Sequence, residues 1–84
     1  MPWDEGAFRA LVRAFSPMPP IVRQGAMRKM AARVEAVARD RGREAVGLDE
    51  VYAGCVEVLG RKEPSMLDSL LRALADEGYA APER

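Results

Sequence analysis

The sequence predicts an all-α protein in which a short, a long and a second short helix form a core and a fourth helix is added at the C-terminus. Apolar residues recur at helical spacing in four segments, and each segment ends at a glycine or a proline-rich break. No stretch alternates like a strand or repeats internally. A chain of 84 residues suits one domain. We expect residues 1–60 to form the three-helix part and residues 61–84 an additional helix packed on it.

The first helix is predicted over residues 5–15. Asp4 is a good N-cap for it, and Trp3 with Phe8 has the spacing of a hydrophobic staple across the helix start. The segment 16–20 then ends the helix, because each of its prolines disfavours helical geometry in the residue before it. Residues at helical spacing predict its apolar face: Phe8, Leu11, Val12 and Phe15.

The second helix is the longest and is predicted from Pro20 to about Arg41. Pro20 suits a first helical turn, and Gly42 suits the position just after a helix end. Arg23 falls close to the apolar stripe of this helix, where a charge must reach water, pair with a carboxylate or meet a ligand. The stripe consists of Met27, Met30, Ala31, Val34 and Ala38.

The third helix is predicted over residues 48–59. Gly47 stands at its N-cap, Glu50 follows where the carboxylate of a capping box belongs, and Gly60 ends it. Cys55 lies on its apolar side, so we interpret it as a core residue rather than a nucleophile, which would need a basic neighbour. That side consists of Leu48, Val51, Tyr52, Cys55, Val58 and Leu59.

The fourth helix follows an expected turn at residues 61–64. Ser65 and Asp68 have the spacing of a capping box at its start, and Gly78 ends it. We expect the tail, residues 80–84, to be frayed. Four leucines predict the apolar face: Leu67, Leu70, Leu71 and Leu74.

The composition argues against several classes of function. The chain has no His and one Cys, so it lacks the commonest general base, the commonest metal ligand and any internal disulfide. We therefore expect no metal site and no enzymatic activity of the chain alone. No apolar run approaches the roughly 20 residues that span a membrane, and no signal peptide is recognisable. These features predict a cytoplasmic protein without membrane contact.

Charge is distributed unevenly although the net charge is zero. Residues 1–43 hold nine Lys/Arg against four Asp/Glu, a balance of +5, and residues 44–84 hold four against nine, a balance of −5. The simplest interpretation is that the two halves attract each other on folding. Pairing between copies and a basic half that faces nucleic acid are the alternatives.

Two kinds of side chain are candidates for ligand contact. Arg28, with three further basic residues of the long helix, could grip phosphates or the propionates of a tetrapyrrole, or could form an ordinary solvated face. No aromatic residue is interleaved with this set, which argues against binding of single-stranded nucleic acid. Trp3 could stack on a ligand, although its staple position favours a structural role. The three further residues are Lys29, Arg33 and Arg39.

Several short motifs occur in an order that resembles a known family. They are Trp3-Asp4-x-x-Ala7, Leu11, Pro19-x-Ile21-Val22-Arg23, Glu35-x-x-Ala38-x-x-x-Gly42 and Val46-Gly47-x-x-Glu50-Val51. This order resembles the small helical domain at the C-terminus of the B subunit of light-independent protochlorophyllide reductase, a domain that also occurs in free-standing proteins. The resemblance covers roughly residues 3–58.

The resemblance implies an accessory part rather than a reductase, because the iron–sulfur ligands and the nucleotide site of that enzyme lie outside this domain. It implies docking to a redox partner protein or to a tetrapyrrole-type ligand. The positions that match the family's motifs are Trp3, Pro19, Val22 and Arg23. Two other functions stay open: a DNA-associated, histone-like helical protein, and a structural module that self-associates.

Overall fold

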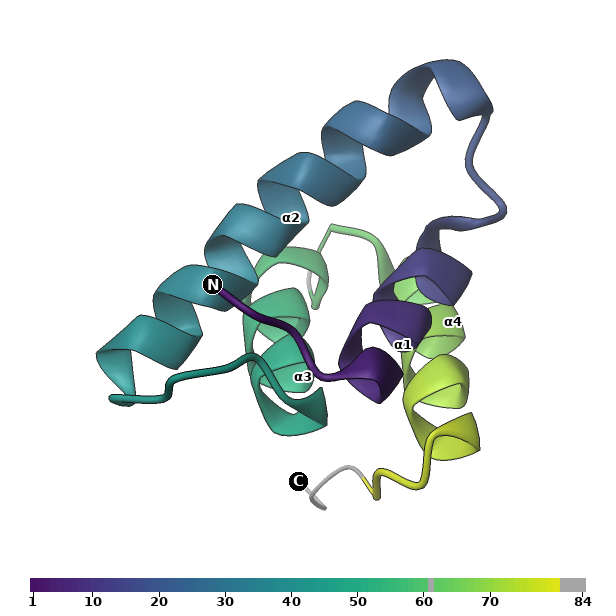
Figure 1. Ribbon diagram of the computed structural model, residues 1–84. Helices are drawn as coiled ribbons and strands as arrows, with labels where there is room; N and C mark the ends of the chain where they lie inside the picture. Colours follow the sequence, from purple (N-terminus) through teal and green to yellow (C-terminus); the bar gives the residue numbers. More distant parts are fainter. Residues whose placement is uncertain (61, 81–84) are drawn as a thin grey trace.

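The computed structural model describes residues 1–60 and 62–80 and confirms the all-α fold class. Its helices are α1 (Glu5–Phe15), α2 (Pro20–Asp40), α3 (Leu48–Leu59) and α4 (Pro64–Asp76), as Figure 1 shows. Within the described residues, the only extended pairing is an isolated parallel bridge between Trp3 and Val46. The predicted turn at Arg61 and the end of the predicted frayed tail, 81–84, lie outside the described residues.

The helices pack as two pairs. α1 lies along α4, α2 packs across α3, and α3 also contacts both α1 and α4. The buried face of α1 is narrow and rich in alanine, so α4 can approach it closely. Its buried residues are Ala7, Ala10, Leu11, Ala14 and Phe15. The facing residues of α4 are Leu67, Leu70, Ala73 and Leu74, which confirms three of the four predicted leucines as buried.

A glycine sets the distance between α2 and α3. A Cβ atom at Gly54 would lie 2.8 Å from Cγ2 and 3.0 Å from Cα of Val34. The two helices therefore approach each other as closely as a backbone without a side chain allows. The predicted stripe of α2 is buried at this contact and one turn to either side of it, at Met30, Val34 and Ala38.

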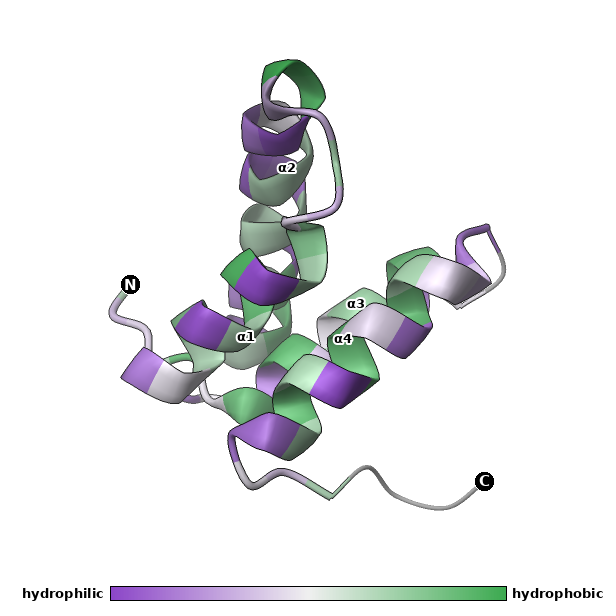
Figure 2. Ribbon diagram, turned by 90° about the vertical axis from the view of Figure 1, so that its right-hand side faces the viewer, coloured by the Kyte–Doolittle hydropathy of each residue, from purple (hydrophilic) through white to green (hydrophobic). Residues whose placement is uncertain are grey.

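The long helix α2 extends beyond the rest of the molecule. It has 21 residues, whereas α3 has 12, which is a difference of about 13 Å at 1.5 Å per residue. No residue of α2 before Met30 is buried, and α2 and α4 do not contact each other among the described residues. Figure 2 shows α2 diverging from the α3 and α4 pair. The wedge between them is the main opening of the fold.

The connection from α2 to α3 is held at both ends. Gly42 has φ of +71°, and the amide of Arg43 donates to the carbonyl of Ala38 at 2.9 Å, which confirms Gly42 as the predicted helix stop. Val46 then pairs with the start of the chain: its amide donates to Pro2 and its carbonyl accepts from Asp4, each at 2.9 Å. The N-terminal segment thereby fixes the loop that leads into α3.

Two predicted helix starts differ in detail from the structure. α4 begins at Pro64, with Glu63 at the N-cap and no side-chain capping bond, so the predicted capping box of Ser65 and Asp68 is wrong. Proline's fixed φ already suits a first helical turn. Asp4 does occupy the N-cap of α1, but its side chain makes no capping bond.

Two side chains assigned to apolar faces are exposed instead. Phe8 is 55% exposed, because the buried face of α1 is centred on Ala7 and Ala10 and position 8 lies about 100° to one side. Val58 is 39% exposed, because it lies on the side of α3 that faces the wedge, which no helix fills. Both side chains border hollows in the surface.

Candidate functional site

The candidate site is a groove of about 740 Å³ in the wedge between α2 and the α3–α4 turn. We call it the methionine groove. It is closed at one end by the end of α1 and the proline-rich segment that follows. Its apolar lining includes Phe15, Met18, Pro19, Met30, Val58, Leu59 and Met66, and its polar lining includes Lys29, Arg33, Glu63 and Ser65. A volume of this size is typical of a ligand or peptide site.

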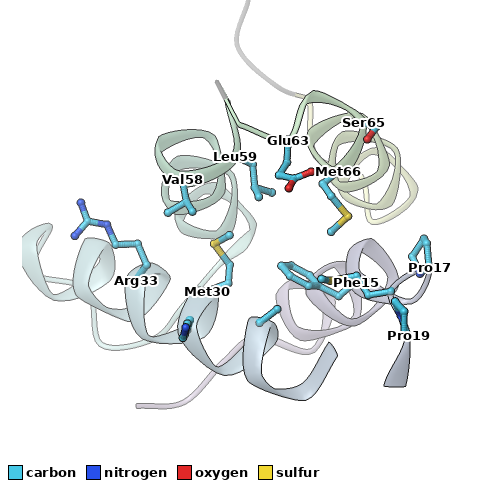
Figure 3. Close-up of a pocket in the computed structure, with 13 residues that line it drawn as sticks. Phe15, Pro17, Pro19, Met30, Arg33, Val58, Leu59, Glu63, Ser65 and Met66 are labelled. Carbon is cyan, nitrogen blue, oxygen red and sulfur yellow. The ribbon is translucent and has the colours of Figure 1, made fainter. Parts of the chain in front are cut away.

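Three of the lining residues are methionines that come from three different segments. Met18 lies in the loop after α1, Met30 in α2 and Met66 in α4. Figure 3 shows Phe15, Met30 and Met66 directed toward a shared space. Flexible thioether side chains adapt to differently shaped apolar partners, so this lining suits a surface that binds rather than one that catalyses.

The two walls of the groove carry opposite charges. Lys29 and Arg33 line the α2 wall, and Glu63 lines the wall at the start of α4. Arg33 forms an ion pair with Glu57 of α3, and its guanidinium points out of the groove in Figure 3. Among the residues that the structure describes, neither Lys29 nor Glu63 has an ion-pair partner within 4 Å. Within residues 1–60 and 62–80, these two charges are therefore not neutralised by an ion pair.

Arg23 has a structural partner rather than a free guanidinium. Its Nε and Nη2 atoms donate to the carbonyl oxygen of Met18, at 3.2 and 3.1 Å. The side chain is half-buried and ties the proline-rich segment to the first turn of α2. It thus supports one end of the methionine groove without lining it.

Trp3 and Arg28 meet at a second, smaller hollow. This hollow of about 380 Å³ lies between α1 and α2, and Phe8, Gln24 and Met27 also line it. The indole Nε1 of Trp3 donates to Oε2 of Glu35 at 2.8 Å, so its polar edge is already satisfied. Trp3 and Phe8 border the same hollow.

The structure does not gather the predicted site residues at one place. Pro19 lines the methionine groove, whereas Trp3 and Arg28 line the second hollow. Val22 is 47% exposed on the projecting part of α2. Arg23 lines neither hollow and donates to the carbonyl of Met18 in the loop after α1.

A polar cluster at the start of α3 is structural. Glu50 is 1% exposed; its Oε1 accepts from the amide of Gly47 at 3.0 Å and its Oε2 from Arg41 at 3.2 Å. Because Gly47 has no side chain, only the carboxylate half of the predicted capping box is made. Asp49 accepts from Arg41 and from the hydroxyl of Tyr79 at 2.7 Å. Burial and the bond to Asp49 raise the pKa of Tyr79 to about 12.

Two observations concern thiol and metal chemistry in the described part of the chain. Cys55 is fully buried, as predicted, and burial raises the pKa of its thiol to about 12. A thiol with this pKa is not a nucleophile near neutral pH. Within residues 1–60 and 62–80, no group of three His, Cys, Asp or Glu side chains could hold a metal ion.

Pro19, Lys29 and Arg33 of the methionine groove were candidates from the sequence, but its other lining residues were not, and the groove was not identified as a site. Met18, Met30 and Met66 are far apart in the chain, and no spacing rule joins them. The available signal was compositional, because five methionines in a chain of this length indicate an adaptable core or a sticky surface.

Comparisons of the chain with family models, with curated proteins and with solved structures found no match. In the described part of the chain, none of the helices combines the length and the apolar character that crossing a membrane requires.

Proposed function

We propose that this chain is a non-catalytic interaction module that docks a protein partner through the methionine groove. The observation that carries the proposal is the groove itself: an open, mainly apolar concave surface that borders the hydrophobic core. A concave surface lined mainly by apolar side chains, with a few polar groups at its edges, is typical of binding sites. The motif order over residues 3–58, which resembles an accessory domain of a multisubunit reductase, supports the same type of function.

Site-specific photo-crosslinking in the native cell tests the proposal. A benzophenone side chain at Val58, in the groove, is expected to give a discrete heavier adduct on irradiation. The same side chain at Arg72, which is exposed on α4 and does not line the groove, is the matched control. Adducts at neither position, or equally at both, would overturn the docking role.

A tetrapyrrole-type ligand is a second candidate for the same groove. The volume, the apolar lining and the cation Lys29 at one wall suit a planar apolar ring with acidic side groups. Titration with haem or protochlorophyllide is expected to shift the Soret band, and Lys29→Glu to weaken the shift. Arg28→Glu, at the second hollow, is the charge-matched control. An unchanged Soret band at tens of micromolar ligand would eliminate this candidate.

Nucleic acid is less well supported as a partner. Most of the basic residues in the first half are paired with carboxylates of the second half, including Arg9 with Glu77 and Arg13 with Asp76. Paired cations release fewer counterions from DNA, so they contribute less to binding. A mobility-shift assay at low salt is expected to show no binding of duplex DNA.

A further inference from the structure

The start of α2, beside the groove, is exposed although it carries apolar side chains. None of residues 20–29 is buried, yet two β-branched side chains lie at the start of this stretch. Ile21 is 93% exposed and Val22 is 47% exposed. The molecule therefore presents a projecting apolar helix end next to a concave apolar groove.

The charges at the groove would also match those of a second copy of the same groove. Lys29 lies on the α2 wall and Glu63 on the opposite wall, and neither has a partner within 4 Å among the described residues. In a two-fold dimer, a contact from one residue to a different residue of the other copy is repeated in the reverse sense, so a cation on one wall and an anion on the other form two identical pairs. A partner that carried charges of only one sign would pair with the charge on one wall and repel the charge on the other.

We propose that the occupant of the methionine groove is a second copy of this chain, related to the first by a two-fold axis. The projecting start of α2 of each copy lies in the groove of the other. Val22 then covers the exposed side of Val58, and Lys29 of one copy pairs with Glu63 of its mate. This inference rests on the proposed docking function and names its partner.

Sedimentation velocity over a range of protein concentrations and salt concentrations tests the dimer. We expect a reversible dimer whose dissociation constant rises with salt. Lys29→Glu and Glu63→Lys alone are each expected to raise that constant by roughly two- to ten-fold, because each breaks two exposed pairs per dimer. The double variant, which swaps the charges, is expected to return it close to the original value. Val58→Asp is expected to leave only monomer.

Arg72→Glu is the matched charge reversal away from the groove and is expected to leave the dissociation constant unchanged. Circular dichroism melts of every variant separate loss of association from loss of folding. A monomer at all concentrations overturns the inference, and so does a dimer that is insensitive to both Val58→Asp and the charge reversals. If the chain is a monomer but Val58 still crosslinks to a different protein, the docking function stands and only the identity of the partner is wrong.

Discussion

Gly54 is the residue on which the contact between α2 and α3 depends most directly. Because a Cβ there would lie 2.8 Å from Val34, Gly54→Ala is expected to destabilise the fold by about 1–3 kcal/mol through overpacking. Gly25 is the matched control, since it is also helical but has nothing within 4 Å of its Cβ position. Gly25→Ala is expected to stabilise by about 0.5–1 kcal/mol. Urea unfolding measures both, and equal effects of the two substitutions would contradict the close approach.

Cys55 predicts how stability depends on alkaline pH. Burial raises the pKa of its thiol from the ordinary 9.0 to about 12. Below pH 9 the thiol is protonated in both states, so its contribution to stability is complete. Between pH 9 and about 12 the unfolded state loses the proton first, and stability falls by up to about 1.4 kcal/mol per pH unit.

Comparison of the wild type with Cys55→Ala isolates this effect, because the raised pKa of Tyr79 is common to both proteins. Urea unfolding at a series of pH values is expected to show a shallower alkaline loss for the variant. Parallel curves for the two proteins would show that the thiol ionises as freely in the folded state as in the unfolded one.

At the scale of an element, the start of α3 depends on one buried carboxylate. Glu50→Ala is expected to destabilise by about 1–3 kcal/mol, because it leaves the buried amide of Gly47 without an acceptor. Glu50→Gln retains a carbonyl oxygen for that amide and is expected to cost less. Hydrogen exchange at the Gly47 amide distinguishes the two, with faster exchange in the Ala variant only. Similar exchange in both variants would indicate that the amide is held by something else.

Helix boundaries followed from the sequence wherever a local signal decides them. The bounds of α1 and α3 agree with the prediction residue for residue, because a cap position, an apolar period and a breaker all coincide there. The start of α4 was wrong because Pro64 and the Ser65–Asp68 pair are competing signals one residue apart. The exposure of Phe8 was missed because the small residue Ala7 determines which face of α1 is buried.

The candidate site was less predictable than the helices that form it. The methionine groove exists because α2 is longer than α3 and diverges from α4, and this divergence depends on packing between helices rather than on any local pattern. Helical spacing did place Arg23 near the apolar stripe of α2. It could not show that the carbonyl of Met18 would lie within reach of the guanidinium.

At the scale of the whole molecule, the two charged halves of the chain neutralise each other. Every ion pair among the described residues joins residues 1–43 to residues 44–84, apart from the two i,i+4 pairs within helices. This arrangement agrees with the simplest interpretation of the charge asymmetry. The loss of thermal stability at acidic pH therefore tests whether these ion pairs between distant parts of the chain stabilise the fold.

Arg9 and Glu77 provide that test. Arg9 donates to both carboxylate oxygens of Glu77, at 3.0 and 2.8 Å, and this holds the pKa of Glu77 below its ordinary value of 4.5. The pair therefore stabilises the fold above pH 4.5 and loses its effect as the pH falls through the lowered pKa. Glu77→Gln is expected to flatten the loss of thermal stability below pH 4.5.

Glu44→Gln is the matched control for this experiment, because Glu44 is exposed and forms no ion pair with another described residue. Thermal midpoints measured from neutral to acidic pH are expected to follow the wild type for Glu44→Gln and to diverge from it for Glu77→Gln. If the thermal midpoints of the two variants fell in the same way at acidic pH, the bidentate pair would be ruled out as a source of stability.

The packing of α1 against α4 has a consequence for how the chain is made. α1 leaves the ribosome first, but the helix that covers its buried face is the last of the described helices to emerge. At about 5–20 residues per second, this delay is roughly 3–12 s. During that time the alanine-rich face of α1 is open to chaperones and to neighbouring nascent chains. Cotranslational folding of this protein is therefore expected to finish in a single late step rather than helix by helix.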